Sequence, residues 1–238
     1  MIDVETDGRI RNVTLDRPEA RNALTIDGLE ALEAAIRDVD EDGRNGPSVI
    51  YLHGRGGAFS AGADLNEVAD LDRREAVEFA RLGQRVARAI EDSPAVVVAG
   101  IEGPARGGGL ELALACDVRV GTPDSSYGEP GVTFGLFGAW GGTVRLPRVL
   151  GEGNALEFAL SGRVVDAEAA LQMGLISRIE DEPRAVAEEI VGNAPDALAA
   201  LKRRLRDDRE RATQERLEAD AFGELIDAHG DDVAGLLE

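Results

Sequence analysis

The sequence predicts an α/β protein with a layered core, and three observations lead to this fold class. Short apolar runs typical of buried strands recur along the chain, and segments with apolar residues at helical spacing separate them. The chain has 238 residues, enough to bury a substantial core in one large domain or two small ones. No segment has the composition of a linker.

The first elements are predicted to be a β-hairpin and a helix. Residues 4–6 and 9–15 flank a turn at residues 7–8, which is a hairpin pattern. Thr25 can cap a helix that runs to about Asp38, because apolar residues follow it at helical spacing. These residues are Leu29, Leu32, Ile36 and Val39.

Strands and helices are then expected to alternate. The expected strands span residues 49–53, 95–101 and 118–120. The expected helices span about residues 71–91, 108–115, 153–160 and 167–173. From Ala194 onward the chain is helical in character, with an intermittent apolar stripe at Leu201, Leu205, Leu217, Phe222, Leu225 and Ile226. This stripe predicts an intersubunit or lid surface, with an ordinary core contact as the alternative.

The charge balance is strongly acidic. The net charge is −20, and Lys202 is the only lysine among 26 basic residues. Nucleic acids and anionic membranes are therefore not expected as partners, because both bind clustered positive charge. An acidic, lysine-poor surface fits a salty cytoplasm, where the Debye length at about 1 M salt is only about 3 Å. An ordinary acidic protein is the alternative to a salt-adapted one.

The absence of long apolar runs and the single cysteine predict a cytoplasmic protein without an internal disulfide. No apolar run approaches the roughly 20 residues of a membrane helix. Residues 1–5 lack the basic and apolar regions of a signal peptide. Cys116 is the only cysteine, so it is expected to be a small core residue, and the common zinc-finger spacings are absent. No metal is expected.

A glycine-rich segment carries the clearest chemical signal. Residues 107–109 are three glycines that open an apolar helix, and Glu111 follows among leucines. Backbone N–H groups at such a helix start can approach a ligand that gains negative charge. Burial among leucines would raise the pKa of Glu111 and suit it to proton transfer. The alternative is an acid that only stabilises the first helical turn.

Residues 58–66, with the sequence Ala-Phe-Ser-Ala-Gly-Ala-Asp-Leu-Asn, add a second motif after a predicted strand. Together with the glycine-rich segment, it resembles the crotonase family, also called the enoyl-CoA hydratase/isomerase superfamily. Residues 16–24, 141–148 and 167–176 resemble further motifs of that family, in the same order. The resemblance therefore covers most of the chain.

The resemblance implies a spiral of ββα units with a C-terminal helical region. Residues 1–193 would form the acyl-CoA-binding core, and residues 194–238 would form a trimerisation or lid region. The implied substrate is an acyl-CoA thioester, with coenzyme A as part of the substrate and no separate cofactor. The implied assembly is a homotrimer or a dimer of trimers.

The resemblance also places the site. The backbone N–H groups of Ala63 and Gly108 match the family's oxyanion hole, and such amides stabilise a charged thioester oxygen without reorganisation. Glu111 matches its first catalytic glutamate. Residues expected along the substrate path are Ala61, Gly62, Asp64, Leu65, Asn66, Gly107 and Gly109. Arg17 and Arg21 are candidates for coenzyme phosphate contacts or are solvated charges.

Position 131 departs from the family pattern. The second family glutamate should follow Pro130, where this chain has Gly131. Syn addition of water needs a base and a proton donor on one face of the substrate. Glu129 could replace the missing acid, because a residue before proline favours extended geometry and positions 129 and 131 could share a side. We expect instead that Glu129 faces solvent.

The remaining expectations concern two bulky side chains near the site and the reaction that the protein catalyses. Phe137 and Trp140 either reshape the acyl pocket or belong to the core. Hydration of a 2-enoyl-CoA is the first functional expectation, and double-bond isomerisation or non-catalytic acyl-CoA binding are the alternatives. A serine peptidase of related fold is not expected, because Ser60 and Ser125 lack a glycine-flanked nucleophile turn and His53 lies in a predicted strand.

Overall fold

The computed structural model describes residues 1–39 and 46–235. Residues 40–45 of the predicted core and residues 236–238 of the predicted C-terminal region lie outside the described residues. The predicted boundary between residues 193 and 194 falls in the connection between two helices, α8 (Arg184–Val191) and α9 (Pro195–Leu205).

The main sheet of the described chain has the strand order β1-β2-β3-β4-β6-β9. β1 (Ile2–Asp7) and β2 (Ile10–Leu15) form the expected antiparallel hairpin. The other neighbours are parallel, and they are β3 (Val49–Gly54), β4 (Val96–Ile101), β6 (Val118–Gly121) and β9 (Arg178–Ile179). β4 is buried along its whole length, which is why it reads as one continuous apolar run.

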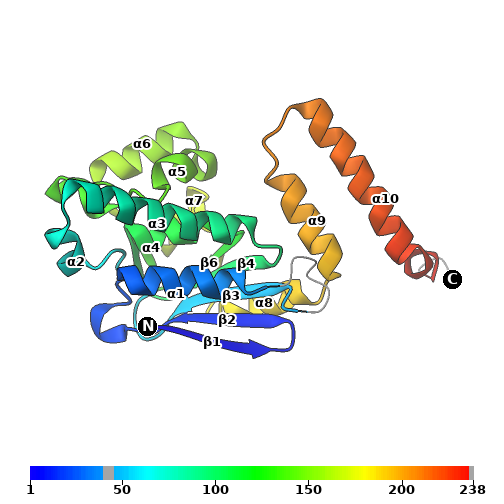
Figure 1. Ribbon diagram of the computed structural model, residues 1–238, viewed down its shortest axis with the longest axis horizontal. Helices are drawn as coiled ribbons and strands as arrows, with labels where there is room; N and C mark the ends of the chain where they lie inside the picture. Colours follow the sequence, from blue (N-terminus) through cyan, green and yellow to red (C-terminus); the bar gives the residue numbers. More distant parts are fainter. Residues whose placement is uncertain (40–45, 236–238) are drawn as a thin grey trace.

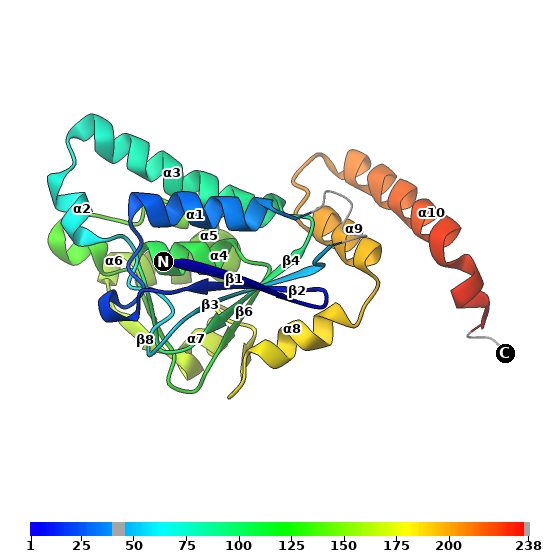
Figure 2. The ribbon, with the colours of Figure 1, turned by 60° about the horizontal axis from the view of Figure 1, so that its bottom comes forward.

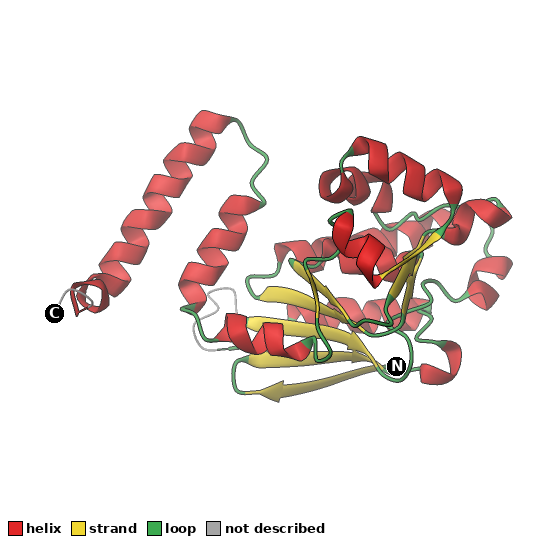
Figure 3. Ribbon diagram, turned by 180° about the vertical axis from the view of Figure 1, so that it is seen from behind, coloured by secondary structure: helices red, strands yellow, loops and turns green. Residues whose placement is uncertain are grey.

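Helices cover both faces of this sheet (Figure 2). α1 (Ile26–Arg37), α3 (Arg73–Asp92) and α4 (Gly108–Ala115) lie on one face and enclose the larger apolar core. α8 lies across the other face (Figure 3). There Val186 and Ala187 pack in one cluster with strand residues such as Val98. The alternation of strands and helices therefore gives the layered α/β core that the sequence predicts.

A second sheet brings the site segments together. Its order is β5-β7-β8, with β5 (Pro104–Arg106), β7 (Ser126–Gly128) and β8 (Val164–Asp166). β5 runs directly into α4, and β7 runs into the short 3₁₀ helix η2 (Pro130–Phe134). Another 3₁₀ helix, η1 (Pro18–Ala20), precedes α1.

Several predicted helix bounds need correction. The helix expected at residues 71–91 is preceded by a separate helix, α2 (Leu65–Asp70), and begins at Arg73 as α3. Asp72 and Glu75 form a capping box, because each side chain accepts the other residue's backbone N–H at 2.8 Å. The remaining helices around the site are α5 (Gly142–Leu150), which was not predicted, α6 (Glu152–Ser161) and α7 (Ala167–Gln172).

Of the two C-terminal helices, α9 (Pro195–Leu205) contacts the core, whereas α10 (Arg211–Gly235) extends away from it. α10 runs beside α9 and apart from the two sheets (Figure 1). Several residues of the predicted apolar stripe are exposed, with 77% of Leu205 and 66% of Phe222 accessible to solvent. Within one described chain, these side chains therefore do not form a core contact.

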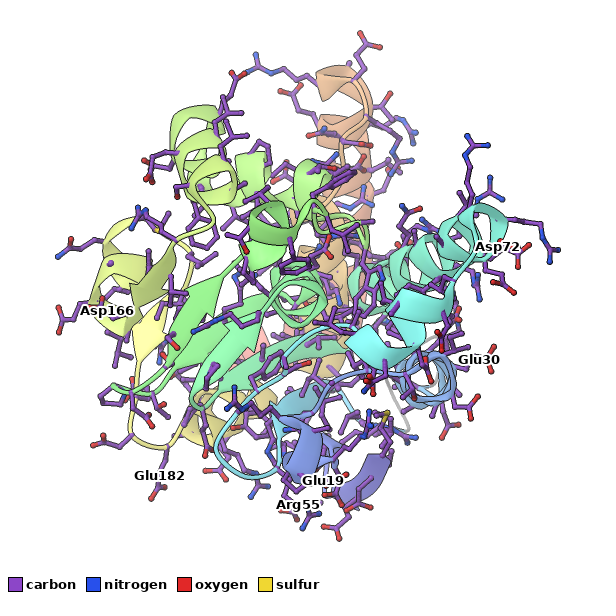
Figure 4. The ribbon with its side chains drawn as sticks, turned by 90° about the vertical axis from the view of Figure 1, so that its left-hand side faces the viewer. Glu19, Glu30, Arg55, Asp72, Asp166 and Glu182 are labelled. Carbon is purple, nitrogen blue, oxygen red and sulfur yellow. The ribbon has the colours of Figure 1, made fainter. Side chains whose placement is uncertain are left out.

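Charged side chains surround the molecule. Glu19, Glu30 and Glu182 lie at its periphery, as the labelled side chains in Figure 4 show. Cys116 is buried, as expected, and burial raises the pKa of its thiol. No helix within the described residues combines the length and the apolar character that a bilayer crossing requires.

Candidate active site

The three glycines at the start of α4 have two different structural reasons, backbone conformation at Gly107 and close packing at Gly108 and Gly109. Gly107 adopts a φ of +47°, in the region that favours glycine. A Cβ on Gly108 would lie 2.2 Å from the Trp140 ring, and a Cβ on Gly109 would lie 2.6 Å from the Cβ of Ser60. Close packing therefore accounts for two of the three glycines, in addition to any approach of a ligand.

Two backbone N–H groups near the start of α4 have no acceptor within the described residues. Leu24 and Ala63 form an isolated parallel β-bridge. In this bridge Leu24 N–H donates to Gly62 O at 2.8 Å, and Asp64 N–H donates to Leu24 O at 2.9 Å. The N–H of Ala63, between these two bonds, therefore points away from Leu24. A Cβ on Gly62 would lie 2.9 Å from the nitrogen of Gly108, so the two segments touch. Among residues 1–39 and 46–235, neither Ala63 N–H nor Gly108 N–H donates a hydrogen bond.

The Glu111 carboxyl lies one helical turn away and is 1% exposed. Its Oε1 accepts the N–H of Trp140 at 2.9 Å and the N–H of Gly142 at 2.6 Å. Burial raises its pKa to about 7, although these N–H groups and the charge of Arg145 oppose the rise. A carboxyl that titrates near neutral pH can both take and give a proton there.

Glu129 is buried, and the expectation that it faces solvent is wrong. The residue is 6% exposed, and its Oε1 is buried without a hydrogen-bond partner in the described chain. Burial, and then the nearby charge of Glu111, raise its pKa to about 8. Glu129 lies between β7 and η2, and its side chain is buried beside the cavity that it lines.

An apolar cavity of about 630 Å³ adjoins both carboxyls. Glu129 lines it directly, and so do Gly138 and Gly142. A Cβ on either glycine would lie within 2.8 Å of a Glu111 carboxyl atom, so Glu111 lies directly behind them. The apolar lining comes from the η2 loop, α5 and α6, and includes Val132, Leu136, Phe137, Leu146, Ala155, Leu156, Ala159 and Leu160.

The two carboxyls differ in their hydrogen-bond partners. Glu111 receives two backbone N–H donors, which favour its carboxylate. Glu129 Oε1 receives no donor from the part of the chain that the structure describes, and the negative charge of Glu111 favours the protonated form of Glu129. Near neutral pH the pair therefore offers one base, Glu111, and one acid, Glu129.

Phe137 and Trp140 have different surroundings. Phe137 lines the cavity and is 68% exposed. Trp140 is 3% exposed and packs edge-on against Phe79, with ring centroids 5.6 Å apart. Of the two alternatives predicted for these residues, Trp140 belongs to the core and Phe137 borders the cavity.

Of the predicted substrate-path residues, those from Ala61 to Asn66 lie at the start of α2, and Gly107 and Gly109 lie at the start of α4. Asp64 is 5% exposed, caps α2 by accepting the N–H of Asn66 at 2.9 Å, and pairs with Arg17 at 2.5 Å. Hydrogen bonding from Arg17 lowers the pKa of Asp64. This pairing gives Arg17 and Asp64 a structural role, whereas Arg21, Leu65 and Asn66 are exposed.

Gly131 occupies a tight position. A Cβ there would lie 3.0 Å from the carbonyl oxygen of Leu136 and 3.1 Å from the Cα of Phe137. The η2 loop therefore closes over the position where the family pattern has its second glutamate. Glu129, two residues earlier, lines the apolar cavity, whereas Gly131 is not among its lining residues.

Ser60 and His53, which a serine peptidase could have used, have hydrogen-bond partners outside the candidate site. Ser60 is fully buried and its hydroxyl donates to the carbonyl oxygen of Asn22 at 2.8 Å. His53 Nε2 lies 3.0 Å from the Thr14 hydroxyl in the main sheet. Both contacts agree with the exclusion of a serine peptidase.

The sequence analysis missed the α5 and α6 side of the site. Leu156 and Leu160, at helical spacing on α6, line the cavity together with Ala155 and Ala159. Their spacing was a usable signal of one apolar helix face. Arg145 of α5 lies within the motif at residues 141–148, but its partner Glu91 is 54 residues away in the sequence, so a local pattern does not predict their pairing.

Comparison with known proteins gives a consistent family match. The model of the enoyl-CoA hydratase/isomerase family matches residues 5–230. The short-chain-enoyl-CoA hydratase of Clostridium acetobutylicum is 33% identical over 94% of this chain and 88% of its own length. The crotonyl-CoA hydratase of Syntrophomonas wolfei is 34% identical over 92% of this chain and 87% of its own length. The crystal structure of an enoyl-CoA hydratase from Bacillus anthracis is 30% identical, covers 99% of this chain and 94% of its own, and superposes with a TM-score of 0.91.

Proposed function

The chain belongs to the enoyl-CoA hydratase/isomerase family, the crotonase superfamily, and on that premise we propose that it adds water to the 2,3 double bond of an acyl-CoA thioester. The observation that carries this proposal is the pair of buried carboxyls, Glu111 and Glu129, beside one apolar cavity. Hydration needs a base and an acid on one face of the substrate, and this pair offers both.

The proposed reaction uses the protonation states that the site favours. Glu111 takes a proton from water as the water oxygen bonds to C3 of the substrate. The electrons of the double bond move toward the thioester oxygen, and Glu129 gives its proton to C2. One molecule of water is added in total, and transfer of the proton from Glu111 back to Glu129 through solvent restores the site.

The thioester oxygen needs stabilisation while it carries negative charge. The N–H groups of Ala63 and Gly108, which have no acceptor among the described residues, come from adjoining segments and suit an oxyanion hole. The acyl chain would occupy the apolar cavity past Phe137. Ala61, Leu65 and Asn66 would lie beside the coenzyme portion, with no cofactor beyond the coenzyme A of the substrate.

The assembly and setting of the enzyme are part of the proposal. The exposed apolar residues on α9 and α10 support a trimerisation or lid role for residues 194–238, in a trimer or a dimer of trimers. The net charge of −20 supports a salt-adapted cytoplasmic enzyme. Light scattering after gel filtration in molar KCl tests the assembly, and a monomer would contradict it.

The reaction itself is tested by ultraviolet absorbance with purified protein in molar KCl. Loss of the conjugated enoyl-thioester band from a 2-enoyl-CoA supports hydration. Appearance of that band from a 3-enoyl-CoA, with no hydration, would instead identify an isomerase. Binding without either change would identify a non-catalytic acyl-CoA protein. The second carboxyl, Glu129, favours hydration over an isomerisation in which Glu111 acts alone.

A further inference from the structure

Arg145 joins the end of α3 to the turn that holds Glu111. Its side chain is 9% exposed, its Nε donates to Glu91 Oε1 at 3.0 Å, and its Nη2 pairs with the other carboxylate oxygen of Glu91. Its Nη1 donates to the carbonyl oxygen of Trp140 at 3.3 Å. One planar guanidinium therefore holds a carboxylate through two nitrogens and a backbone carbonyl through the third.

The contacted turn supplies both donors to Glu111. Trp140 N–H and Gly142 N–H bond the carboxylate, and the carbonyl bound by Arg145 belongs to Trp140 itself. Gly141, between the two donors, has a φ of +110°, and a Cβ there would lie 2.0 Å from Arg145 Nη1. The guanidinium thus lies directly against the peptide that separates the two donors.

Glu91 also receives a cation from the C-terminal helices. Arg206, at the end of α9, lies 3.2 Å from Glu91 and 2.8 Å from Asp117. Lys202 of α9 is 6% exposed and lies 2.8 Å from Asp117. The network therefore ties α9 to the same carboxylate that orients Arg145.

We propose that Arg145, oriented by Glu91, is a positioning residue that fixes the turn from Trp140 to Gly142 and so holds the Glu111 carboxylate in place. The expected effect on turnover rests on the proposed function, whereas the fixing of the turn rests on the geometry alone. A lysine at position 145 would keep the charge but could not hold Glu91 and Trp140 together, because an ammonium lacks the planar fork.

The electrostatic consequence has a definite sign. The charged and titratable groups that act on Glu111 in the described chain are Arg145 on α5 and Glu129 after β7. Arg145 favours the carboxylate directly and through the N–H donors that it positions. A looser turn would therefore raise the pKa of Glu111 and move the pH at which the base becomes active upward.

The experiment uses Arg145→Lys and Glu91→Gln in the full-length protein. Trp140 is the only tryptophan of the chain, so its fluorescence during a pH titration reports directly on the turn. We expect the fluorescence midpoint to rise by about half to one pH unit in both variants. In turnover of a 2-enoyl-CoA, we expect kcat to fall about tenfold, its acidic limb to move the same way, and KM to stay within about threefold.

Arg178→Gln is the matched control, because it removes an exposed arginine–glutamate pair of 2.6 Å remote from the cavity lining. It should change neither the midpoint nor kcat. Folded variants of both Arg145 and Glu91 with the wild-type fluorescence midpoint would overturn the positioning role. If the wild-type protein hydrates no enoyl-CoA, the proposed function fails, but the fluorescence titration still decides the role of Arg145.

Discussion

At the scale of single residues, the proposed mechanism gives Glu111 and Glu129 different tasks because their hydrogen-bond partners differ. We expect Glu111→Gln to lower turnover by about 10²- to 10⁴-fold and to leave acyl-CoA affinity within several-fold, because a general base acts mainly in the transition state. Steady-state kinetics and equilibrium binding measure the two effects. A variant with near wild-type turnover would remove Glu111 from the mechanism.

Glu129→Gln tests the acid. We expect it to slow exchange of the α-proton in deuterated buffer by about 10²-fold or more, because an amide cannot replace the proton donor. Proton NMR of the product or of a saturated acyl-CoA follows the exchange. Glu157→Gln, which alters an exposed glutamate on α6, is the control and should leave the exchange unchanged.

The same pair makes stability depend on pH. In the folded state the pKa of Glu111 is about 7 and that of Glu129 is about 8, both above the ordinary 4.5. Between pH 4.5 and these values the folded chain therefore binds more protons than the unfolded chain. Their contribution to stability is complete below about pH 4.5 and is lost as the pH rises through 7 and 8. In urea unfolding, the free energy of unfolding should fall less between pH 5 and pH 8 in the double variant Glu111→Gln/Glu129→Gln than in the wild type. An equal change of the unfolding free energy with pH in both proteins would contradict the raised pKa values.

Gly131→Glu tests whether the family position can be restored. The proposed acid already comes from Glu129, and a Cβ at position 131 would press on Leu136 and Phe137. We therefore expect lower stability by about 1–3 kcal/mol, as for other overpacked sites, and no gain in hydration rate. Thermal unfolding and the absorbance assay measure both. A folded variant with faster hydration would show that position 131 is the better place for the acid.

At the scale of elements, the turn before α2 brings Ala63 to the start of α4. Ala63→Pro deletes one N–H that has no acceptor in the described chain, so it removes no internal hydrogen bond. We expect a rate loss of about 10²- to 10³-fold, the usual effect of losing one oxyanion donor. Because proline can also distort the turn, unfolding must be unchanged for the result to count. Full activity in the folded variant would contradict the role of Ala63.

Element boundaries show how far a local reading reaches. The helical pattern near residue 71 concealed a break, although the pair Asp72 and Glu75 has the spacing of a capping box and was a usable sign of where α3 begins. The hairpin of β1 and β2 was predictable because its turn and its alternation are local. β5, β7 and β8 are only three residues long, and their pairing depends on distant partners.

At the scale of the whole molecule, the net charge of −20 makes the folded state repel itself at low salt. We expect stability and activity to rise together as KCl increases from about 0.1 M to above 1 M, because the Debye length falls from about 10 Å to about 3 Å. Thermal unfolding and the absorbance assay across a KCl series measure the rise. Equal stability throughout the series would contradict salt adaptation.

The sequence by itself determined the family, the α/β class and the position of Glu111, because glycine runs, apolar periodicity and motif order are local properties of the chain. Only the tertiary structure decided where Glu129 points, what Arg145 pairs with and which helices line the cavity. Each of these depends on residues far apart in sequence. A carboxyl's burial, hydrogen bonds and charged neighbours are set by all the elements packed around it, and no single segment of the chain contains them.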